Sequence, residues 1–581
     1  MSTPRASLPT LRAFMGSLAL KRTTTKTNGL YKLQGMGQDP MTQSDTDVMD
    51  VVNAAIAVAP ISVASFGALG DGSTDDTAAI RAALLALSTA GGGTLIVPAT
   101  GSAHVVTDSL AVPSNCRITG GGTLRMSVRS KDLLTATSAS NVTIDGVTLQ
   151  GYSASTSPTT STAESSSSAI HFVDCANVTV IGCTFTGFRY SPAFFEGCAS
   201  VRYQRNTETD CALSVRFRGV QRGWILENHA SQPALPASTF VTVIYLDSTD
   251  GHSYGVCTDI EIDKNHVADF VNSQAIEIHA GDRVHIGSGN VLSNVLIGVS
   301  VNPFNSADRC RDISIDAFSY VGTDTVGGSG GNYGLSIQGG AAGAIAGDPG
   351  YYVENVTING PKIRNANSVL RASLSGAGAI FQHVKGLAIN GIVCDGCYGS
   401  GVVISGDCLA VTGGGIVVKG TILANGRRAG VLFTGTGNTG RLVGVHVDDA
   451  VGAVQYDAVG DGLSIHDVAG TNIATALVVS NDKGVVNGSR YKTDAATTVD
   501  VTGASSVTMA DTGACSVTNL TGGVEGQIVT LHFTNGNTTI TRANAKLAGS
   551  VNFTGAANQS LTLKKVSTLW IEIGRYTTAV G

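Results

Sequence analysis

The stretches Asn141-Val-Thr-Ile144, Asn177-Val-Thr-Val180 and Asp312-Ile-Ser-Ile315 are copies of one pattern, in which two apolar residues alternate with polar ones. The pattern recurs about a dozen times along the chain, often opened by Asn or Asp. Alternation of this kind predicts half-buried β-strands. From Val178 to Val201 the step between copies is 23 residues. At roughly 3.3 Å per strand residue, that length makes three short strands and three corners, which is one coil of a solenoid.

The spacing of the copies favours a solenoid over an antiparallel sandwich or barrel. Those folds need hairpin turns at every second strand, and few Asn-Gly or Asp-Gly pairs lie between matched strands in this sequence. Longer steps, such as the one from Val142 to Val178, are interpreted as one coil with an inserted loop. Because a single coil cannot bury its apolar faces, the coils must stack continuously and their ends must be covered.

A helix is predicted directly before the first coils, where it would cover the open end of the stack. Thr74 is the predicted cap, and Asp75 and Asp76 favour the positive end of the helix dipole. The glycines at positions 91 to 93 end the helix. Its apolar face is formed by Ile80, Leu84 and Leu87.

This region resembles the opening signature of the pectate-lyase-like superfamily, which is found in many bacteriophage tailspikes. The resemblance is carried by Phe66-Gly-Ala-Leu-Gly-Asp-Gly72, Asp75-Asp-Thr-Ala-Ala-Ile80 and Gly91-Gly-Gly-Thr-Leu-Ile-Val-Pro98. It is specific over about forty residues, and the coil pattern extends it to about residue 480. It implies an all-β fold, a right-handed single-stranded parallel β-helix with an N-terminal capping helix. Catalytic residues are not part of the signature.

Three regions are expected. Residues 1–60 form an N-terminal segment for attachment to a virion, since positions 1–35 hold six basic residues and no acid. Residues 61–490 form the β-helix. Residues 491–581 form a separate antiparallel β module, because alternating strands such as Leu569-Trp-Ile-Glu-Ile-Gly-Arg575 close the chain. This ending resembles the C-terminal modules of tailspikes, which implies a homotrimer; the role expected for the module is trimerisation or, as the alternative, glycan binding.

Composition excludes several classes of function. A formal net charge of −6 offers no general attraction for nucleic acid or for an anionic membrane. No stretch is long and apolar enough to suggest a transmembrane helix. The 11 cysteines are scattered singly and are interpreted as reduced core residues. Cys394 and Cys397 form a CxxC without a second pair, so we expect neither a bound metal nor a cofactor.

A candidate site emerges when four strands are aligned by their inward residues. Val215 and Phe217 match Ile244 and Leu246, and the following strands continue this alignment. Outward residues of successive coils then line up about 4.8 Å apart and form a long polar face that suits an extended polymer. The outward residues are Arg216 and Arg218, Tyr245 and Asp247, Glu277 and His279, and Ser300 and Asn302.

Asp247 and Glu277 are the predicted catalytic pair. Strand geometry places their backbones about 8 Å apart, and glycosidases need two carboxyl groups separated by roughly 5 to 9.5 Å. Glu277 is the preferred acid and Asp247 the preferred base, with the reverse assignment left open. Arg216 and Arg218 are expected to hold an acidic sugar, and Tyr245 to stack on a sugar ring. The remaining predicted substrate-binding residues are His279, Asp250, His252, Asp282 and Asn302.

The resemblance and the candidate site together predict a phage tailspike that recognises and depolymerises a bacterial capsule or O-antigen by endo-glycosidic hydrolysis. Its expected partners are that polysaccharide, two further copies of itself, and a phage tail or baseplate protein bound through the N-terminus. Two alternatives stay open: a polysaccharide lyase acting by β-elimination, and a receptor-binding spike without catalytic activity. A secreted bacterial enzyme is disfavoured, because the chain shows no apolar signal sequence.

Overall fold

The computed structural model describes residues 60–577, apart from several gaps. The gaps are 130, 153–167, 189, 212, 233–241, 249–253, 272, 304–307, 323–332, 341–351, 367–376, 398, 421–428, 435–436, 449–451, 457–462, 470–474, 480–484, 487–488, 493–496, 503, 512 and 544. The predicted attachment segment and the predicted site residues Asp250 and His252 lie outside the described residues.

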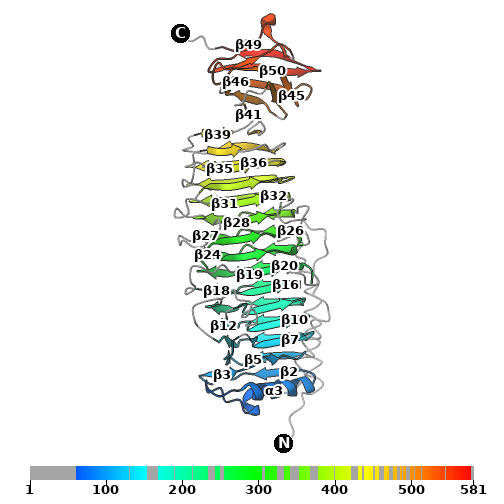
Figure 1. The fold of residues 1–581 in the computed structure, drawn as a ribbon, viewed down its shortest axis with the longest axis vertical. Coiled ribbons are helices and arrows are strands. Elements are labelled where there is room, and N and C mark those ends of the chain that lie inside the picture. The colour runs from blue at the N-terminus through cyan, green and yellow to red at the C-terminus, as the bar shows by residue number, and fades with distance from the viewer. Residues whose placement is uncertain are drawn as a thin grey trace, which may run out of the picture. The chain divides into compact units, whose positions relative to one another are not determined.

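Successive coils of the chain contribute strands to three parallel ladders, so the predicted right-handed parallel β-helix is confirmed (Figure 1). One ladder is a separate fourteen-stranded sheet. Its strands are β4 (Leu110–Ala111), β7 (Leu134–Thr137), β10 (Ile170–Val173), β13 (Ala193–Glu196), β16 (Val215–Arg218), β19 (Thr242–Asp247), β22 (Gln274–Ile278), β25 (Ile297–Val301), β28 (Tyr333–Gln338), β31 (Ala377–Gln382), β33 (Ser400–Ser405), β35 (Ala429–Thr434), β37 (Gly452–Tyr456) and β39 (Thr475–Val479).

The other two ladders merge in the long strand β32. The second ladder holds β1 (Ile61–Ser62), β2 (Gly93–Ile96), β5 (Cys116–Thr119), β8 (Ser140–Asp145), β11 (Ala176–Ile181), β14 (Ala199–Gln204), β17 (Gln221–Leu226), β20 (Cys257–Asp263), β23 (Gly281–Ile286), β26 (Cys310–Ile315), β29 (Val353–Ile358), β32 (Val384–Asp395), β34 (Thr412–Lys419), β36 (Gly440–Asp448), β38 (Leu463–Ala469) and β40 (Val485–Val486). The third holds β3 (Ala103–Val106), β6 (Thr123–Met126), β9 (Thr148–Gln150), β12 (Thr184–Thr186), β15 (Thr207–Thr209), β18 (His229–Ser231), β21 (His266–Ala268), β24 (Val291–Val295), β27 (Ser319–Gly322) and β30 (Lys362–Arg364).

The residue that opens each copy of the repeat makes a corner of the coil. Asn141, Asn177, Asp312 and Asn355 all have φ between 54° and 58°, in the left-handed region. Asn and Asp tolerate this conformation better than other residues with a β-carbon, because their short polar side chains can bond locally. Their amides also bond from coil to coil, as when the Asn177 Nδ2 donates to the Asn141 Oδ1 at 3.1 Å. The preference for Asn and Asp therefore has a conformational cause.

The interior of the coils is filled by one continuous stack of apolar side chains, which runs from Val63 to Ile465. All eleven cysteines are free and buried, which confirms their interpretation as core residues. The interior also holds a row of buried asparagines, in which Asn228, Asn265 and Asn290 bond to one another through their amides. The inward alternation of the repeat thus packs a single core, with polar ladders where corners recur.

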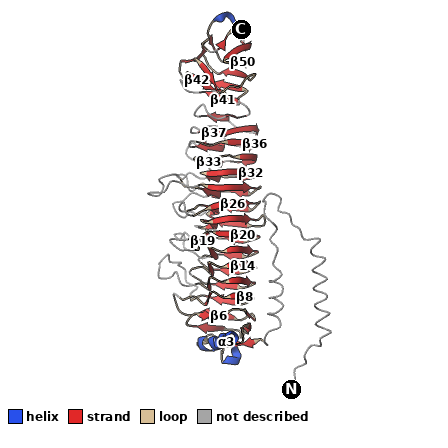
Figure 2. Cartoon of the chain, turned by 90° about the vertical axis from the view of Figure 1, so that its right-hand side faces the viewer, coloured by secondary structure: helices blue, strands red, loops and turns tan. Residues whose placement is uncertain are grey.

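Helix α3 (Thr77–Thr89) lies at the N-terminal end of the coils, as predicted, and Figure 2 shows it below the stacked strands. Its buried side includes Ile80, Leu84 and Leu87. The predicted cap was wrong, because the helix begins at Thr77 and Thr74 bonds to the Asp71 carboxylate instead. A short 3-10 helix, η1 (Val63–Phe66), precedes α3.

Asp76 has a role that the helix-dipole interpretation did not include. Its carboxylate accepts from the backbone of Leu69 and Gly70 and lies 2.8 Å from the His104 Nδ1. Both Asp76 and His104 are buried. The second Asp of the Asp75-Asp76 pair therefore fastens the preceding loop to strand β3.

A second buried core belongs to the C-terminal strands and runs from Val499 to Trp570. Strands β46, β50 and β51 pair antiparallel, as predicted for this module. Parallel pairs also occur in it, β42 with β45, β43 with β46 and β44 with β47, which the sequence pattern did not indicate. The elements are β41 (Ser489–Lys492), β42 (Thr498–Asp500), β43 (Ser506–Met509), β44 (Cys515–Val517), β45 (Asn519–Thr521), β46 (Ile528–Phe533), β47 (Thr538–Ile540), β48 (Ala545–Lys546), η4 (Ala548–Ser550), β49 (Phe553–Thr554), β50 (Gln559–Val566) and β51 (Leu569–Tyr576).

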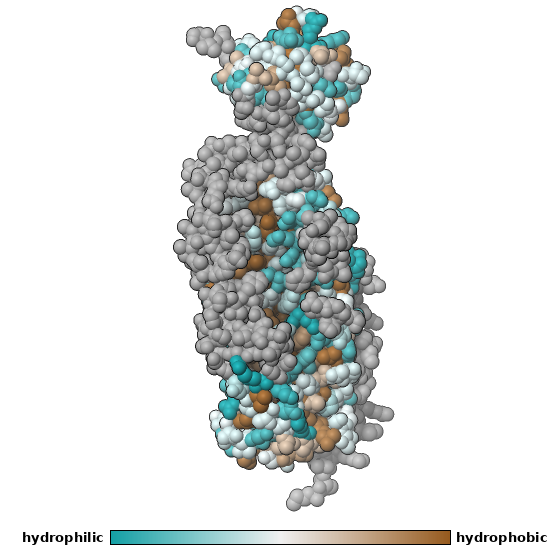
Figure 3. Space-filling view, viewed as in Figure 1, coloured by the Kyte–Doolittle hydropathy of each residue, from teal (hydrophilic) through white to brown (hydrophobic). Residues whose placement is uncertain are grey.

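The surface of the described residues mixes apolar and hydrophilic side chains. On the face drawn in Figure 3, brown apolar residues are scattered among teal and white ones. Several exposed apolar side chains belong to the C-terminal module. They are Val524, Ile528, Val551, Val566, Ile573 and Tyr576.

Candidate functional site

The predicted alignment of the candidate strands is the register that the structure has. Arg216 pairs with Tyr245, which pairs with Glu277, which pairs with Ser300. In the neighbouring row, Arg218 pairs with Asp247. The alternation of inward and outward residues on β16, β19 and β22 therefore brings six predicted side chains onto one side of the fourteen-stranded sheet. We call Arg216, Arg218, Tyr245, Asp247, Glu277 and His279 the candidate cluster.

Asp247 is held by both arginines of the preceding coil. The Arg216 Nη2 donates to its Oδ2, and the Arg218 Nε lies 3.5 Å from its Oδ1. Asp247 is only 2% exposed. Both carboxylate oxygens thus face guanidinium groups, as a buried ion needs in order to be stable.

The two arginines are committed to protein partners. Arg216 donates to the Tyr190 hydroxyl in addition to Asp247, and Arg218 donates to the Glu196 Oε1 at 2.5 Å. Burial alone would lower the pKa of the Arg216 guanidinium, but the Asp247 carboxylate raises it well above its usual value. The predicted role of these arginines as a clamp for an acidic sugar would require these ion pairs to open.

Glu277 accepts from three side chains around it. The Gln274 Nε2 donates to its Oε1 at 2.8 Å, the Thr242 hydroxyl donates to its Oε2, and the His279 Nε2 lies 2.6 Å from Oε1. Glu277 is 4% exposed. The His279 Nε2 and the Gln274 amide thus meet one carboxyl oxygen, and the Thr242 hydroxyl meets the other. The carboxyl group is thus fixed in position from both of its oxygens.

Tyr245 connects the two halves of the candidate cluster. Its hydroxyl lies 2.9 Å from the His279 Nδ1, and the Arg216 guanidinium lies 5.0 Å from the centre of its ring. Burial, together with the charges of Asp247 and Glu277, raises the pKa of the Tyr245 hydroxyl well above its usual value. The phenol therefore stays protonated at neutral pH. Arg216 covers part of the ring that was expected to stack on a sugar.

The cluster continues on three earlier coils, through residues that the sequence analysis missed. The Glu196 carboxylate receives Arg218 and lies 2.7 Å from the His171 Nε2, while the His171 Nδ1 lies 2.9 Å from Asp132. Burial alone would lower the pKa of His171, but the Asp132 and Glu196 carboxylates raise it to about 9. Burial alone would raise the pKa of Glu196, but His171 and Arg218 lower it. An imidazolium thus bridges the two carboxylates.

The alignment could have found these residues if it had been extended to earlier strands. Phe194 pairs with Arg216, and Glu196 pairs with Arg218. His171 pairs with Phe194 one strand further back, and the two rings stack with centres 4.9 Å apart. In β13, Ala193 and Phe195 alternate with Phe194 and Glu196. This alternation would have placed Phe194 and Glu196 on the outward side, next to Arg216 and Arg218.

Two other predicted site residues make no printed side-chain contact with this cluster, although Asn302 lies one strand beyond His279 in the same row, because Val301 pairs with Ile278. Asp282 lies on β23 in the second ladder, where the Arg311 Nη2 donates to it at 2.9 Å and the Arg283 Nη1 at 3.3 Å. Asn302 follows β25 and is exposed, and its backbone nitrogen donates to the Ile278 carbonyl at 2.9 Å. Asp282 is therefore engaged in a ladder of ion pairs between coils.

Among the described residues, no group of three or more His, Cys, Asp or Glu side chains is arranged to hold a metal ion. Within the same part of the chain, no helix combines the length and the apolar character needed to cross a membrane.

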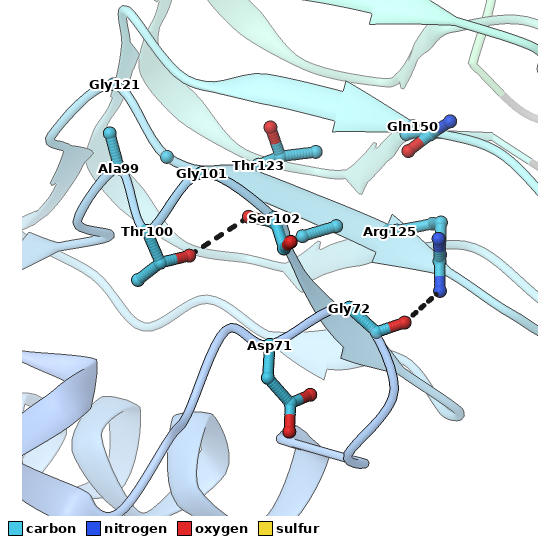
Figure 4. Close-up of a pocket in the computed structure, with 12 residues that line it drawn as sticks. Asp71, Gly72, Ala99, Thr100, Gly101, Ser102, Gly121, Thr123, Arg125 and Gln150 are labelled. Atoms are coloured by element: carbon cyan, nitrogen blue, oxygen red, sulfur yellow. Dashed lines mark hydrogen bonds between the residues drawn. The ribbon is translucent and has the colours of Figure 1, made fainter.

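A pocket of about 630 Å³ lies away from the candidate cluster, at strands β3 and β6 (Figure 4). None of the predicted site residues lines it. Asp71 accepts from the backbone nitrogens of Ser73 and Thr74, and the Arg125 Nη2 donates to the Gly72 carbonyl at 2.7 Å. Because its charged side chains hold its own loop together, this pocket offers less chemistry than the candidate cluster.

Comparison with known proteins gives a local match. No protein-family model matches the chain. Over 65 residues it is 48% identical to the mannuronan C5-epimerases AlgE3 and AlgE1 of Azotobacter vinelandii. The match covers 10% of this chain, and 4% of AlgE3 and 5% of AlgE1. The chain therefore spans only a small part of the curated relatives that it matches.

Solved structures similar to this chain include two phage proteins. The pre-mature gene product 12 of bacteriophage phi29 is 14% identical, with a TM-score of 0.48, 85% of this chain and 69% of that chain covered. Tailspike protein 3 of bacteriophage CBA120 is 12% identical, with a TM-score of 0.38, 81% and 68% covered. An exopolygalacturonase from Thermotoga maritima is 16% identical, with a TM-score of 0.36, 64% and 91% covered.

Proposed function

We propose that this chain binds a polysaccharide of a bacterial surface, a capsule or an O-antigen, along the fourteen-stranded sheet and hydrolyses it at internal bonds. The observation that supports this most is the position of Asp247 and Glu277. They lie on adjacent strands, offset by two residues, which corresponds to about 8 Å between their backbones. That offset suits the two carboxyl groups of a glycosidase. The local match to mannuronan C5-epimerases adds support for a glycan substrate.

In this proposal Asp247 is the base. The proton that the leaving glycosidic oxygen takes up comes from the Glu277 end of the candidate cluster. The contacts with Arg216 and Arg218 support this assignment over the reverse one, because both Asp247 oxygens face guanidinium groups, which only donate hydrogen bonds. The same pairs weigh against the elimination alternative, which needed an arginine free to act as the base. Hydrolysis is therefore the reaction proposed.

The proposed setting is a phage virion. In this setting three copies of the chain form the spike, residues 1–60 attach it to a tail or baseplate protein, and the β-helix meets the host surface. The basic start of the chain and the tailspike-like signature at residues 66–98 support this assignment.

The test uses the full chain on a panel of purified capsular and O-antigen polysaccharides, with release of reducing ends as the readout. On the polymer that wild type cleaves, we expect Asp247→Asn and Glu277→Gln each to lower kcat by about 100-fold or more. Glu261→Gln is the matched control, because Glu261 is an outward carboxylate of the second ladder. Unchanged kcat in both variants would remove these two residues from the site. A wild-type chain that cleaves no polymer would contradict the proposed activity.

A binding spike without catalytic activity is the second candidate. The observation that favours it is burial: Asp247 and Glu277 are 2% and 4% exposed, as expected for a ladder that holds coils together. Under this alternative the full chain would bind one of the polysaccharides tightly and release no reducing ends from it. The same panel therefore separates the two functions.

A further inference from the structure

Tyr245, His279 and Glu277 form one hydrogen-bonded chain on the fourteen-stranded sheet. The Tyr245 Oη lies 2.9 Å from the His279 Nδ1, and the His279 Nε2 lies 2.6 Å from the Glu277 Oε1. Thr242 and Gln274 fix the far end of this chain, because both donate to the Glu277 carboxylate. The order resembles the arrangement in which a carboxylate orients a histidine and the histidine serves a hydroxyl.

The three members differ in exposure. His279 is 3% exposed and Glu277 is 4% exposed, whereas Tyr245 is only partly buried. A sugar lying on this face would therefore meet the phenol before it met the imidazole or the carboxyl group. A carboxylic acid that donates directly must contact the leaving oxygen. The Glu277 carboxyl instead contacts Thr242, Gln274 and His279.

We infer that Tyr245, backed by His279 and Glu277, is the catalytic residue that donates a proton to the glycosidic oxygen. This inference rests on the proposed hydrolysis and names the donor within it. Glu277 then acts through His279, as a positioning residue that also stabilises the imidazolium. Asp247 keeps its role as the base.

The proton transfers balance when His279 starts as an imidazolium. Its Nδ1–H then donates to the Tyr245 oxygen, which leaves the phenol O–H free to donate outward. As the bond from the anomeric carbon to the glycosidic oxygen breaks, its electron pair stays on that oxygen, which takes the phenol proton. The phenol oxygen takes the Nδ1 proton and His279 becomes neutral. Water adds to the anomeric carbon and gives its proton to Asp247, and exchange with solvent restores both groups.

Arg216 couples the two ends of this reaction. Its guanidinium lies 5.0 Å from the centre of the Tyr245 ring and donates to Asp247. A cation at this distance stabilises negative charge that develops on the phenol oxygen during transfer. One side chain therefore positions the proposed donor and the proposed base together.

The test is Tyr245→Phe, which removes the hydroxyl and keeps the ring against Arg216. On the polymer that wild type cleaves, we expect kcat to fall by about 100-fold with little change in KM. His279→Gln should also lower kcat with little change in KM, whereas a merely structural role would lower the amount of folded protein and leave kcat per folded molecule unchanged. Tyr352→Phe is the matched control, because its hydroxyl donates to Asp407 at 3.1 Å and its ring lies beside His383, away from this site.

The outcomes separate the inference from the proposed function. Suppose that wild type cleaves, and that Tyr245→Phe stays within about threefold of its kcat with an unchanged KM. The donor is then not Tyr245, while the hydrolysis stands. If wild type releases no reducing ends from any polymer, both fall together.

Discussion

Arg216 on β16 and Asp247 on β19 form an ion pair that is almost completely out of contact with water. Their side chains are 11% and 2% exposed, and the Arg216 Nη2 donates to the Asp247 Oδ2. This pair joins adjacent coils of the β-helix at the centre of the candidate cluster. Its effect on stability can be separated from any effect on catalysis.

Replacing Arg216 by Ala should destabilise the fold, because Asp247 would lose a buried partner. We expect the free energy of unfolding to fall by about 3 kcal/mol, the usual cost of breaking a buried pair. The control is Arg117→Ala, since Arg117 is 54% exposed in its pair with Asp145, and exposed pairs contribute about 0 to 1 kcal/mol. Denaturant unfolding followed by circular dichroism measures both. Equal losses in the two variants would contradict the assignment of Arg216 as a buried partner.

The asparagine row inside the coils offers a second test. Asn265 is 1% exposed, bonds to Asn228 and Asn290, and donates to the Ile225 carbonyl at 2.8 Å. Asn265→Ala should lower the free energy of unfolding by about 2 to 4 kcal/mol, because several buried polar groups would lose their partners. Asn390→Ala, at an exposed amide that donates to Asn359, should cost less than about 1 kcal/mol. Thermal unfolding midpoints in the opposite order would exclude this role of the row.

Glu208 predicts a stability that falls as the pH rises. It points into the core, and burial raises its pKa to about 7, with Tyr203 and Ser214 donating to it. The folded state therefore binds a proton that the unfolded state releases above the ordinary pKa of 4.5. Stability should decrease between about pH 4.5 and 7 and then level off. Glu208→Gln should flatten this part of the stability curve, and an unchanged slope would show that Glu208 is not its source.

His171 predicts the loss of stability at higher pH. Its two carboxylate partners raise its pKa to about 9 from 6.5, against the opposing effect of burial. The contribution of the imidazolium is fully present below about pH 6.5 and is lost as the pH rises through about 9. His171→Gln should remove this dependence, measured as unfolding midpoints across that range. A midpoint that falls equally in wild type and variant would assign the effect to another group.

The alternation and spacing of the repeat predicted a solenoid and the register of the four candidate strands, and the family resemblance implied the parallel β-helix. Inward residues such as Phe217 and Leu246 pair across strands because each coil must place its apolar side against the next. The preference for Asn at the start of each copy also had a local cause, the positive φ at positions such as Asn141 and Asn177. The alternation and the opening Asn are both local features, contained within a few residues of each repeat copy.

The partners of the candidate site could not be predicted in the same way. Alternation tells which side of a sheet Glu277 faces, but not that Thr242 and Gln274 lie close enough to donate to its carboxylate. Asp282 was placed beside the cluster because it follows β22 closely in sequence. It lies beyond the corner, in the second ladder, where it bonds to Arg311. Corners redirect side chains, and their geometry depends on the neighbouring coil.

The most direct test of the proposed hydrolysis is cleavage in water enriched in heavy oxygen, followed by mass spectrometry of the oligosaccharides released by the full chain. Hydrolysis predicts one labelled oxygen for each bond broken and saturated new ends. Products with unsaturated ends and no label would show elimination instead, and would contradict the proposed roles of Asp247 as the base and Tyr245 as the proton donor.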